Sequence, residues 1–309
     1  MRRGSIALIL FLFLMAGCEK DKDLADRLLR SSVELTDGYC LVHDDQVVLN
    51  HHDIEHYDYG THLIYLKDHI STGELLEEAG NFTVYAGGEE IYTIGTQPGY
   101  SSYAPVGPFI WTHPTFYADN IIAIHYLYPY EVLEGNTADP REDPWIIEAL
   151  EKYGQFYEGL QCEISSIWFS SPDHLALNLK LTNLDPVNYY YLDPEKMGMG
   201  LFHYFTNGLT LQHVETEQSY TNNVEHQEPN QWDSFDMEWM TLLEGNSSVN
   251  LTLRYNNFEQ APEGSYQARF MFPGLQFQVE HDDLAQQHGQ IWLGQLCVYK
   301  EVVISHDLF

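Results

Sequence analysis

Hydrophobic residues follow three different patterns along the chain. An uncharged apolar run, Ile6–Met15, stands near its start, and residues 33–160 mix strand-like alternation with helix-like spacing. From residue 161 to residue 309, short alternating runs recur between turns. Alternation puts apolar side chains on one face of a strand, and helical spacing puts them on one side of a helix. We therefore expect an α+β protein with a leading segment, a small mixed α+β domain (33–160) and an antiparallel β-sandwich (161–309).

The second domain contains nine short runs in which apolar and polar residues alternate. In Leu175–Asn183 and Val249–Tyr255 the apolar side chains fall on one face, as half-buried antiparallel strands require. Repeated short strands without helical patterns predict a sandwich. The runs are Glu163–Phe169, His174–Asn183, Tyr189–Leu192, Gly200–Phe205, Leu209–Val214, Met237–Leu243, Ser248–Tyr255, Ser265–Phe272 and Gln290–Ile304.

The first domain shows the patterns of several strands. Two are expected within Val33–Leu49, and a third over Thr61–Lys67. Phe82–Tyr85 and Glu90–Ile94 flank a glycine-rich turn and predict a hairpin.

Two helices are also expected in the first domain. Ser71–Glu74 has the pattern of a capping box, and Gly80 stands where that helix would end. A second helix is predicted from Pro144 to Tyr153, because proline suits the first helical position and Asp143 suits the N-cap. The second motif therefore has a structural explanation, and we assign it no chemistry.

The first 18 residues have the plan of a secretory signal. A charged start is followed by the apolar run and by the small residues Ala16 and Gly17. The run is too short for a membrane span, which needs about 20 apolar residues. The stretch Leu14–Cys18 resembles the lipobox of bacterial lipoproteins, with Met15 where that family more often has Leu, Val or Ile.

The lipobox resemblance implies that residues 1–18 are a lipoprotein signal peptide whose Cys18 is lipidated. Residues 19–32 are then a polar stem. Acyl chains on one cysteine can hold a body at a bilayer, since each buried methylene contributes about 0.8 kcal/mol. We expect a protein of the bacterial cell envelope, anchored to a membrane by lipid and facing either the periplasm or the cell surface.

The charge of the chain limits its partners. Lys and Arg number 14 and Asp and Glu number 46, which gives a formal net charge of -32. Such a body repels phosphate backbones, so nucleic acid is excluded as an expected partner. The two interpretations of the charge are a solvated acidic surface, which we favour, and attraction of cations or basic partners.

Three cysteines remain after Cys18, namely Cys40, Cys162 and Cys297. An odd number in an oxidising compartment allows one internal disulfide at most. Cys162 and Cys297 lie on the first and last expected strands of the second domain, so we expect these two to pair. Unpaired buried thiols are the alternative.

Two resemblances concern the fold. Leu179–Asn183, Leu242–Ser248 and Gly264–Phe270 resemble the immunoglobulin-like domains that bacteria attach to secreted proteins, over about 140 residues. The order of elements from Val47 to Ile110 resembles the periplasmic head domain of the Sec translocon's export accessory subunits, over about 70 residues. The first resemblance implies an immunoglobulin-like sandwich that binds a ligand or acts as a spacer. The second resemblance implies only a fold and no function.

The densest group of ionisable side chains is His51–His62, with four histidines and three carboxylates. Imidazole and carboxylate are zinc ligands, and His52, Asp53 and His56 are the first candidates. The competing interpretation, which we favour, is a polar turn between strands. A second group, His281, Asp282, Asp283 and His288, lacks the spacing of a calcium loop and is expected to be an acidic surface loop.

No motif of a serine hydrolase, a phosphate-binding loop or a paired-carboxylate glycosidase is found. Between Glu215 and Phe235 a polar stretch with Tyr220 and Trp232 predicts a long loop, either disordered or able to grip a glycan or peptide. We therefore expect a non-enzymatic module that binds a protein or glycan and needs no cofactor. A metal-dependent envelope hydrolase that uses the His51–His62 segment is the alternative, and an envelope spacer without ligand is a third possibility.

Overall fold

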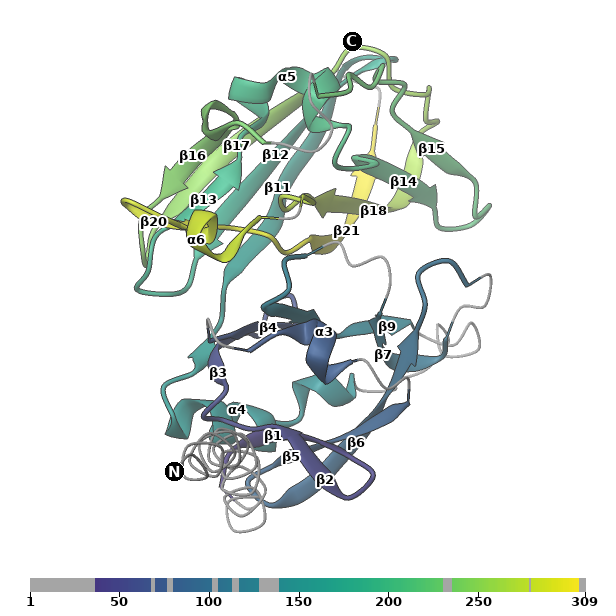
Figure 1. The fold of residues 1–309 in the computed structure, drawn as a ribbon. Coiled ribbons are helices and arrows are strands. Elements are labelled where there is room, and N and C mark those ends of the chain that lie inside the picture. The colour runs from purple at the N-terminus through teal and green to yellow at the C-terminus, as the bar shows by residue number, and fades with distance from the viewer. Residues whose placement is uncertain are drawn as a thin grey trace, which may run out of the picture. The chain divides into compact units, whose positions relative to one another are not determined.

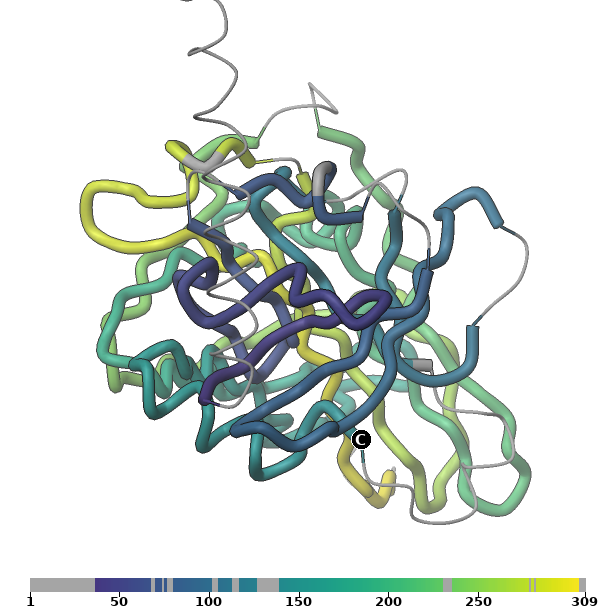
Figure 2. Tube along the Cα trace, turned by 60° about the horizontal axis from the view of Figure 1, so that its bottom comes forward, coloured from purple at the N-terminus to yellow at the C-terminus, as the bar shows by residue number. Residues whose placement is uncertain are grey.

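The structure is a computed structural model that describes residues 37–67, 70–76, 80–101, 105–112, 117–127, 139–229, 235–277 and 279–305, coloured in Figure 2. The expected signal segment (1–18), Cys18 and the stem (19–32) lie outside these residues. Within them the chain is mostly β, with several sheets and few helices (Figure 1). None of the described helices has the length and hydropathy needed to cross a membrane.

The chain forms two compact units, each built from three stretches. The N-terminal unit comprises Met1–Glu55, Ile70–His113 and Ile124–Phe156, and the C-terminal unit comprises His56–His69, Pro114–Ala123 and Tyr157–Phe309. The expected boundary near residue 160 therefore corresponds to the last of the points at which the chain passes between the two units, between Phe156 and Tyr157. Two stretches of the first half belong to the C-terminal unit, because their apolar side chains pack in its core.

The N-terminal unit is built on a six-stranded sheet. All its neighbouring strands are antiparallel except β6 and β7, which are parallel. The tight β5–β6 turn uses Gly87 (φ 57°) and Gly88 (φ 87°), which matches the primed turns that join hairpin strands. The strand order is β2 (Gln46–Leu49), β1 (Tyr39–His43), β5 (Asn81–Ala86), β6 (Glu89–Gln97), β7 (Gly107–Trp111) and β9 (His125–Leu127).

The helix predicted after Asp143 is confirmed as α4 (Pro144–Lys152). The Asp143 side chain accepts a hydrogen bond from the Trp145 backbone N–H at 2.9 Å, and Gly154 follows the helix with φ 66°. The helix predicted after Ser71 is only the short α3 (Thr72–Leu75). One 3-10 helix, η2 (Pro140–Glu142), precedes α4.

The C-terminal unit contains four sheets. The strands β3 and β10 begin in the N-terminal unit and end in this one. The architecture is compatible with a β-sandwich. The strand order of the first sheet is β10 (Phe156–Tyr157), β3 (Ile54–Asp58), β4 (Leu63–Leu66) and β8 (Ile121–Ala123), and that of the second is β11 (Leu160–Ser171), β12 (His174–Asn183) and β17 (Ser248–Tyr255). The third sheet has the order β16 (Met240–Leu243), β13 (Tyr189–Leu192), β20 (Gly289–Ile291) and β19 (Ala285–Gln286). The fourth has the order β15 (Ser219–Thr221), β14 (Leu209–His213), β18 (Gly264–Phe272) and β21 (Leu296–Ile304).

Three of the nine predicted runs are wrong as continuous strands, and one of them, Met237–Leu243, begins with a short helix and is a strand only from Met240. Gly200–Phe205 overlaps the helix α5 (Pro194–Phe202), which Asp193 caps by accepting from the Glu195 N–H at 2.9 Å. Gln290–Ile304 divides into β20 and β21, because residues 292–295 leave the strand. Short helices also occur at η3 (Met237–Trp239) and α6 (His281–Leu284).

The stretch predicted as a polar loop between Glu215 and Phe235 is partly a strand. β15 pairs with β14, and Tyr220 on β15 is 9% exposed and packs against Tyr266. A single buried tyrosine gave too weak an apolar pattern for this short strand to be predicted. Trp232 lies outside the described residues.

The core of the C-terminal unit collects alternate side chains from its sheets. Leu175, Leu177, Leu179 and Leu181 on β12 are all buried, as their alternation predicts. Large buried side chains fill the space between the sheets, among them Tyr191, Phe202, Phe272 and Trp292. Burial of one such side chain stabilises the fold by about 1.5–3 kcal/mol.

Candidate functional site

The first part of the histidine-rich segment lies in the N-terminal unit, just before β3. His51 is buried and stacks on Tyr153, with ring centroids 3.8 Å apart. His52 is exposed, whereas the buried Asp53 carboxylate accepts from the Asn50 N–H at 3.1 Å. Asp53 thus stabilises a local turn that leads into β3.

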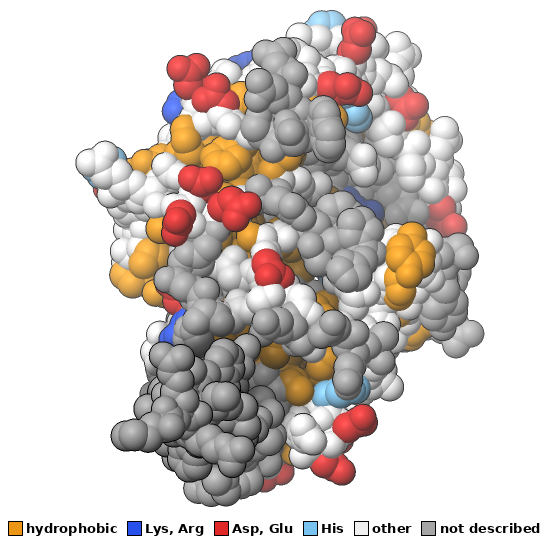
Figure 3. Space-filling view, viewed as in Figure 1, with side chains coloured by type: hydrophobic (Ala, Val, Ile, Leu, Met, Phe, Trp, Pro, Cys, Tyr) orange, Lys and Arg blue, Asp and Glu red, His pale blue; other side chains and the backbone are white. Residues whose placement is uncertain are grey.

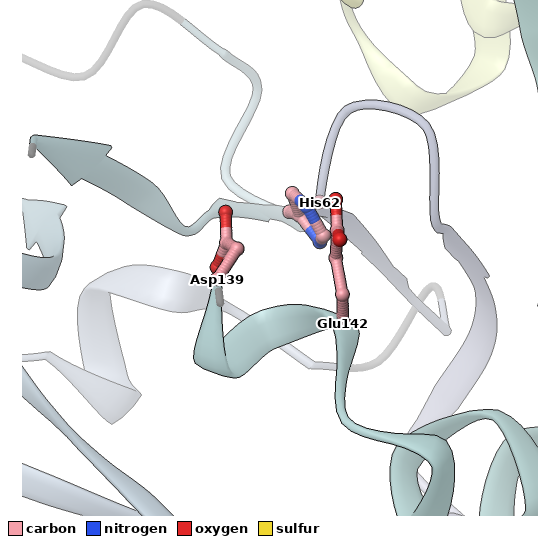
Figure 4. Close-up of side chains that lie close together, drawn as sticks. All are labelled: His62, Asp139 and Glu142. Carbon is pink, nitrogen blue, oxygen red and sulfur yellow. The ribbon is translucent and has the colours of Figure 1, made fainter. Parts of the chain in front are cut away.

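The remaining histidines of the segment lie in the C-terminal unit. His56 is buried, stacks on Tyr65 at 4.1 Å and meets Tyr157 edge-on. Burial lowers the pKa of His56 to about 3, so its imidazole is neutral at neutral pH. His62, labelled in Figure 4, has a left-handed backbone (φ 55°) on the turn between β3 and β4. Its Nδ1 lies 2.9 Å from the Tyr57 hydroxyl.

The expected zinc candidates are not gathered. In the part of the chain that the structure describes, none of His52, Asp53 and His56 belongs to a set of three ligand atoms within 4.8 Å of one another. Packing against aromatic rings accounts for His51 and His56. The polar turn favoured from the sequence did not anticipate that both are buried or that His56 lies within β3.

Figure 4 also shows Asp139 and Glu142, at the two ends of η2 in the N-terminal unit. The Asp139 carboxylate receives a forked interaction from Arg141, with Nη2 and Oδ2 2.6 Å apart. Arg141 Nη1 also donates to the Ile124 carbonyl at 2.6 Å. This partly buried ion pair therefore ties η2 to Ile124, the residue just before β9, within the same unit.

The smaller acidic group lies on and after α6. Asp282, Asp283 and His288 are exposed, and the Asp283 carbonyl accepts from Gln286 Nε2 at 2.6 Å. The group is at the surface as expected, but Asp282 and Asp283 lie on a short helix and not in a loop.

A pair of buried carboxylates, which the sequence did not suggest, lies in the C-terminal unit. Asp58 and Asp185 are 2% and 4% exposed, and they flank Gly159. The Gly159 N–H donates to Asp185 Oδ2 at 2.9 Å, while a Cβ on Gly159 would lie 2.5 Å from Asp58 Oδ1. Gly159 has φ 82°, so this position favours glycine for both its backbone and its space.

The two carboxylates have different surroundings. Asp185 accepts from the N–H groups of Glu158 and Gly159 and from the Tyr189 hydroxyl, at 2.7–2.9 Å. Asp58 Oδ2 accepts from the Thr61 hydroxyl at 2.5 Å, but its buried Oδ1 has no hydrogen-bond partner among the described residues. Burial and the negative charge of Asp185 raise the pKa of Asp58 to about 7. Asp58 therefore holds a proton at mildly acidic pH.

The expected disulfide between Cys162 and Cys297 is wrong, because both are free thiols in the structure. Cys162 faces the core from β11, whereas Cys297 is exposed on β21. The two side chains thus point to different sides of their sheets. The alternative of two unpaired buried thiols is right for Cys162 and wrong for Cys297, which is exposed. Cys40 is also free and buried.

A groove lies between β11 and β21 in the C-terminal unit, and Figure 1 labels both strands. Its volume is about 520 Å³, and it is lined by Cys162, Glu163, Ile164 and Ser165 from β11 and by Val298, Tyr299 and Lys300 from β21. Both strands stand at the edge of their sheets. The groove is therefore bounded by two sheet edges, which natural proteins usually protect.

Lys300 bridges the two strands. Its Nζ donates to the carbonyls of Ile164 and Ser165 at 2.8 and 2.7 Å. Lys300 occupies an inward position of β21, between the inward Val298 and Val302, and a β-bulge in β11 falls at Ser165. A lysine in an otherwise apolar inward row is the one signal in the sequence that could have pointed to this groove.

Comparison with known proteins places no constraint on the chain. No protein-family model matches it, and no curated protein sequence matches it. The groove and the buried carboxylates must therefore be interpreted from their own geometry.

Proposed function

We propose that this protein is a lipid-anchored lipoprotein of the bacterial cell envelope whose β-rich body binds a protein or glycan partner without catalysis. The groove between β11 and β21 carries the binding role, because it offers backbone edges, apolar side chains and the exposed Tyr299 at one place. The lipobox-like stretch that ends at Cys18 supports the anchor.

The immunoglobulin-like arrangement is part of this proposal. The strand-rich C-terminal unit and the phrases around Leu179–Asn183 and Gly264–Phe270 support it. Immunoglobulin-like domains mostly bind ligands or act as spacers, and either role suits a protein that is held at a membrane. Among the described residues, the first ligand candidates of the metal-dependent hydrolase, His52, Asp53 and His56, do not gather, which is why we put the binding role first.

Three measurements in the producing bacterium test the proposal. Labelled palmitate should be incorporated into the tagged wild-type protein but not into a Cys18→Ala variant, which should also leave the membrane fraction. Mild cross-linking on intact cells, followed by mass spectrometry, should recover one reproducible partner with the wild type.

A second variant separates anchoring from binding. Tyr299→Ala removes a side chain that is 59% exposed in the groove, so it should keep the lipid and lose the partner. Thr210→Ala on β14 is the matched control and should keep both. Absence of lipid on Cys18, or recovery of the same partner with Tyr299→Ala, would refute the corresponding half of the proposal.

A further inference from the structure

We propose that the outer face of the β11–β12–β17 sheet binds a neutral glycan, in the form of an extended chain of β-linked glucose or N-acetylglucosamine units. One sugar ring stacks on Trp168, and hydroxyl groups of the chain form hydrogen bonds with Asn178 and Arg254. This face is separate from the groove between β11 and β21, so the inference goes beyond the proposed function.

Strand alternation identifies the outer face of this sheet, whose three strands are labelled in Figure 1. Leu175 and Leu177 on β12 and Leu253 on β17 lie in the core, so the residues between and beside them point to the other side. Trp168, Ala176 and Arg254 are direct neighbours across the three strands. They therefore form one row on the outer face, where Trp168 and Arg254 are exposed.

Trp168 supplies a surface on which a sugar ring can stack. Ala176 is only 3% exposed although it points outward, because the larger side chains of its two cross-strand neighbours cover it. The indole thus lies beside a small side chain on the sheet, and Trp168 is still 45% exposed. Rings of β-linked glucose and N-acetylglucosamine carry their polar groups at the rim, which leaves C–H groups on both faces. Such a face packs on the negative face of an aromatic ring.

The next row of the same face supplies hydrogen-bonding groups. Asn178 Nδ2 donates to Ser166 Oγ at 2.8 Å, and Thr252 Oγ1 donates to Asn178 Oδ1 at 2.7 Å. These two bonds fix the amide and leave it one N–H and one lone pair, which match two neighbouring hydroxyl groups of a sugar. The row lies two residues along β12 from Ala176, or about 7 Å, so an extended chain of linked sugars can reach both rows.

Arg254 supplies further donors. No ion pair joins it to a carboxylate among the described residues, although Asp and Glu outnumber Lys and Arg by 46 to 14. Its guanidinium N–H groups can therefore donate to sugar oxygens.

Charge favours a neutral glycan over an anionic one or a second copy of this chain. The formal net charge is -32, and Figure 3 shows many carboxylates and few cationic side chains on the side in view. A polyanion or another such body is repelled, whereas a neutral glycan is not.

The test is isothermal titration calorimetry of the full-length protein in a zwitterionic detergent with cellohexaose and chitohexaose. At least one of the two should bind saturably, and maltohexaose, whose α-linked chain coils, should bind at least about fivefold more weakly than that chain. Trp168→Ala should weaken binding at least about tenfold, because the stacked ring is lost. Trp145→Ala is the matched control, since this tryptophan on α4 is 48% exposed, and it should leave the affinity unchanged.

Tryptophan fluorescence locates the bound chain. A sugar ring stacked on an indole changes its emission, so the hexasaccharide that binds should shift the emission of the wild type and of Trp145→Phe but not of Trp168→Phe. The melting temperatures of the Trp168 variants should stay near that of the wild type, because the side chain lies at the surface. Loss of binding then reports the site and not unfolding.

Several results would overturn the inference. These are binding of neither cellohexaose nor chitohexaose, equal affinity for maltohexaose, undiminished binding by Trp168→Ala, and an emission shift that persists in Trp168→Phe. Self-association that Trp168→Ala abolishes, without glycan binding, would assign the face to a second copy instead.

The two proposals fail in different ways. Tyr299→Ala should leave the affinity for the hexasaccharide unchanged, and loss of affinity in that variant would move the glycan to the groove and overturn the inference. If the hexasaccharide binds through Trp168 while cells yield neither lipid on Cys18 nor a cross-linked partner, the proposed function fails and the inference stands.

Discussion

Replacing Asp58 with asparagine removes a buried, ionisable carboxyl group with little change of size. The pKa of Asp58 in the folded protein is about 7, whereas its ordinary value is 3.8. The difference is about three pH units, and each unit corresponds to about 1.4 kcal/mol. Ionised Asp58 therefore lowers the free energy of unfolding by about 4 kcal/mol, out of the 5–15 kcal/mol that is usual for a protein.

The sign of the pH dependence follows from proton binding. Because the folded state holds this proton more tightly than the unfolded state, the stabilisation is complete below pH 3.8 and is lost as the pH rises toward about 7. Asparagine keeps an oxygen for the Thr61 hydroxyl and carries no charge. Asp58→Asn should therefore match the wild type near pH 4 and exceed its stability by up to about 4 kcal/mol at pH 8.

The assay is reversible denaturant unfolding of the full-length protein, followed by circular dichroism at several pH values from 4 to 8. Asp282→Asn, at an exposed carboxylate of the same unit, should change stability by no more than about 0.5 kcal/mol at any pH. The reasoning would be refuted if Asp58→Asn were destabilising at pH 8, or if its effect were independent of pH.

Three further outcomes are expected. Gly159→Ala should destabilise the protein by about 2 kcal/mol or more in thermal unfolding, because its backbone is left-handed and a Cβ would collide with buried side chains. Arg141→Lys should cost about 1–3 kcal/mol by the same measurement, since lysine cannot reproduce the forked pairing; an unchanged melting temperature would count against that ion pair. Cys297 should react with a thiol reagent in the native protein, whereas Cys40 and Cys162 should not, because they are buried and burial raises their pKa to about 11 and 12; rapid reaction of three thiols would contradict this burial.

Local patterns predicted the regular elements well. β12, β13 and β17 occupy the predicted residues, and the β5–β6 hairpin and α4 form where turn and capping residues indicated them. These elements depend on neighbouring residues alone, since alternation and capping are properties of short stretches.

The features that the sequence could not supply depend on contacts between distant residues. Asp58 and Asp185 are 127 positions apart along the chain and meet only because both flank Gly159. The wrong disulfide arose in the same way, because strand alternation alone did not reveal that Cys162 faces inward while Cys297 faces outward. The groove required knowledge of which strands end each sheet, and this knowledge comes from topology.

The division of the C-terminal unit into three stretches has a consequence for how the chain is made. Leu63 and Tyr65 on β4 belong to the same core as residues near the C-terminus, such as Phe272 and Ile304. Because synthesis starts at the N-terminus, more than 200 further residues must be made after these early side chains before their core is complete. Long-range contacts of this kind slow folding and leave apolar surface exposed meanwhile. A fragment that begins at Tyr157 would lack the early strands altogether. Chaperones that shield the incomplete chain should therefore matter more for this unit than for a domain formed from one continuous stretch.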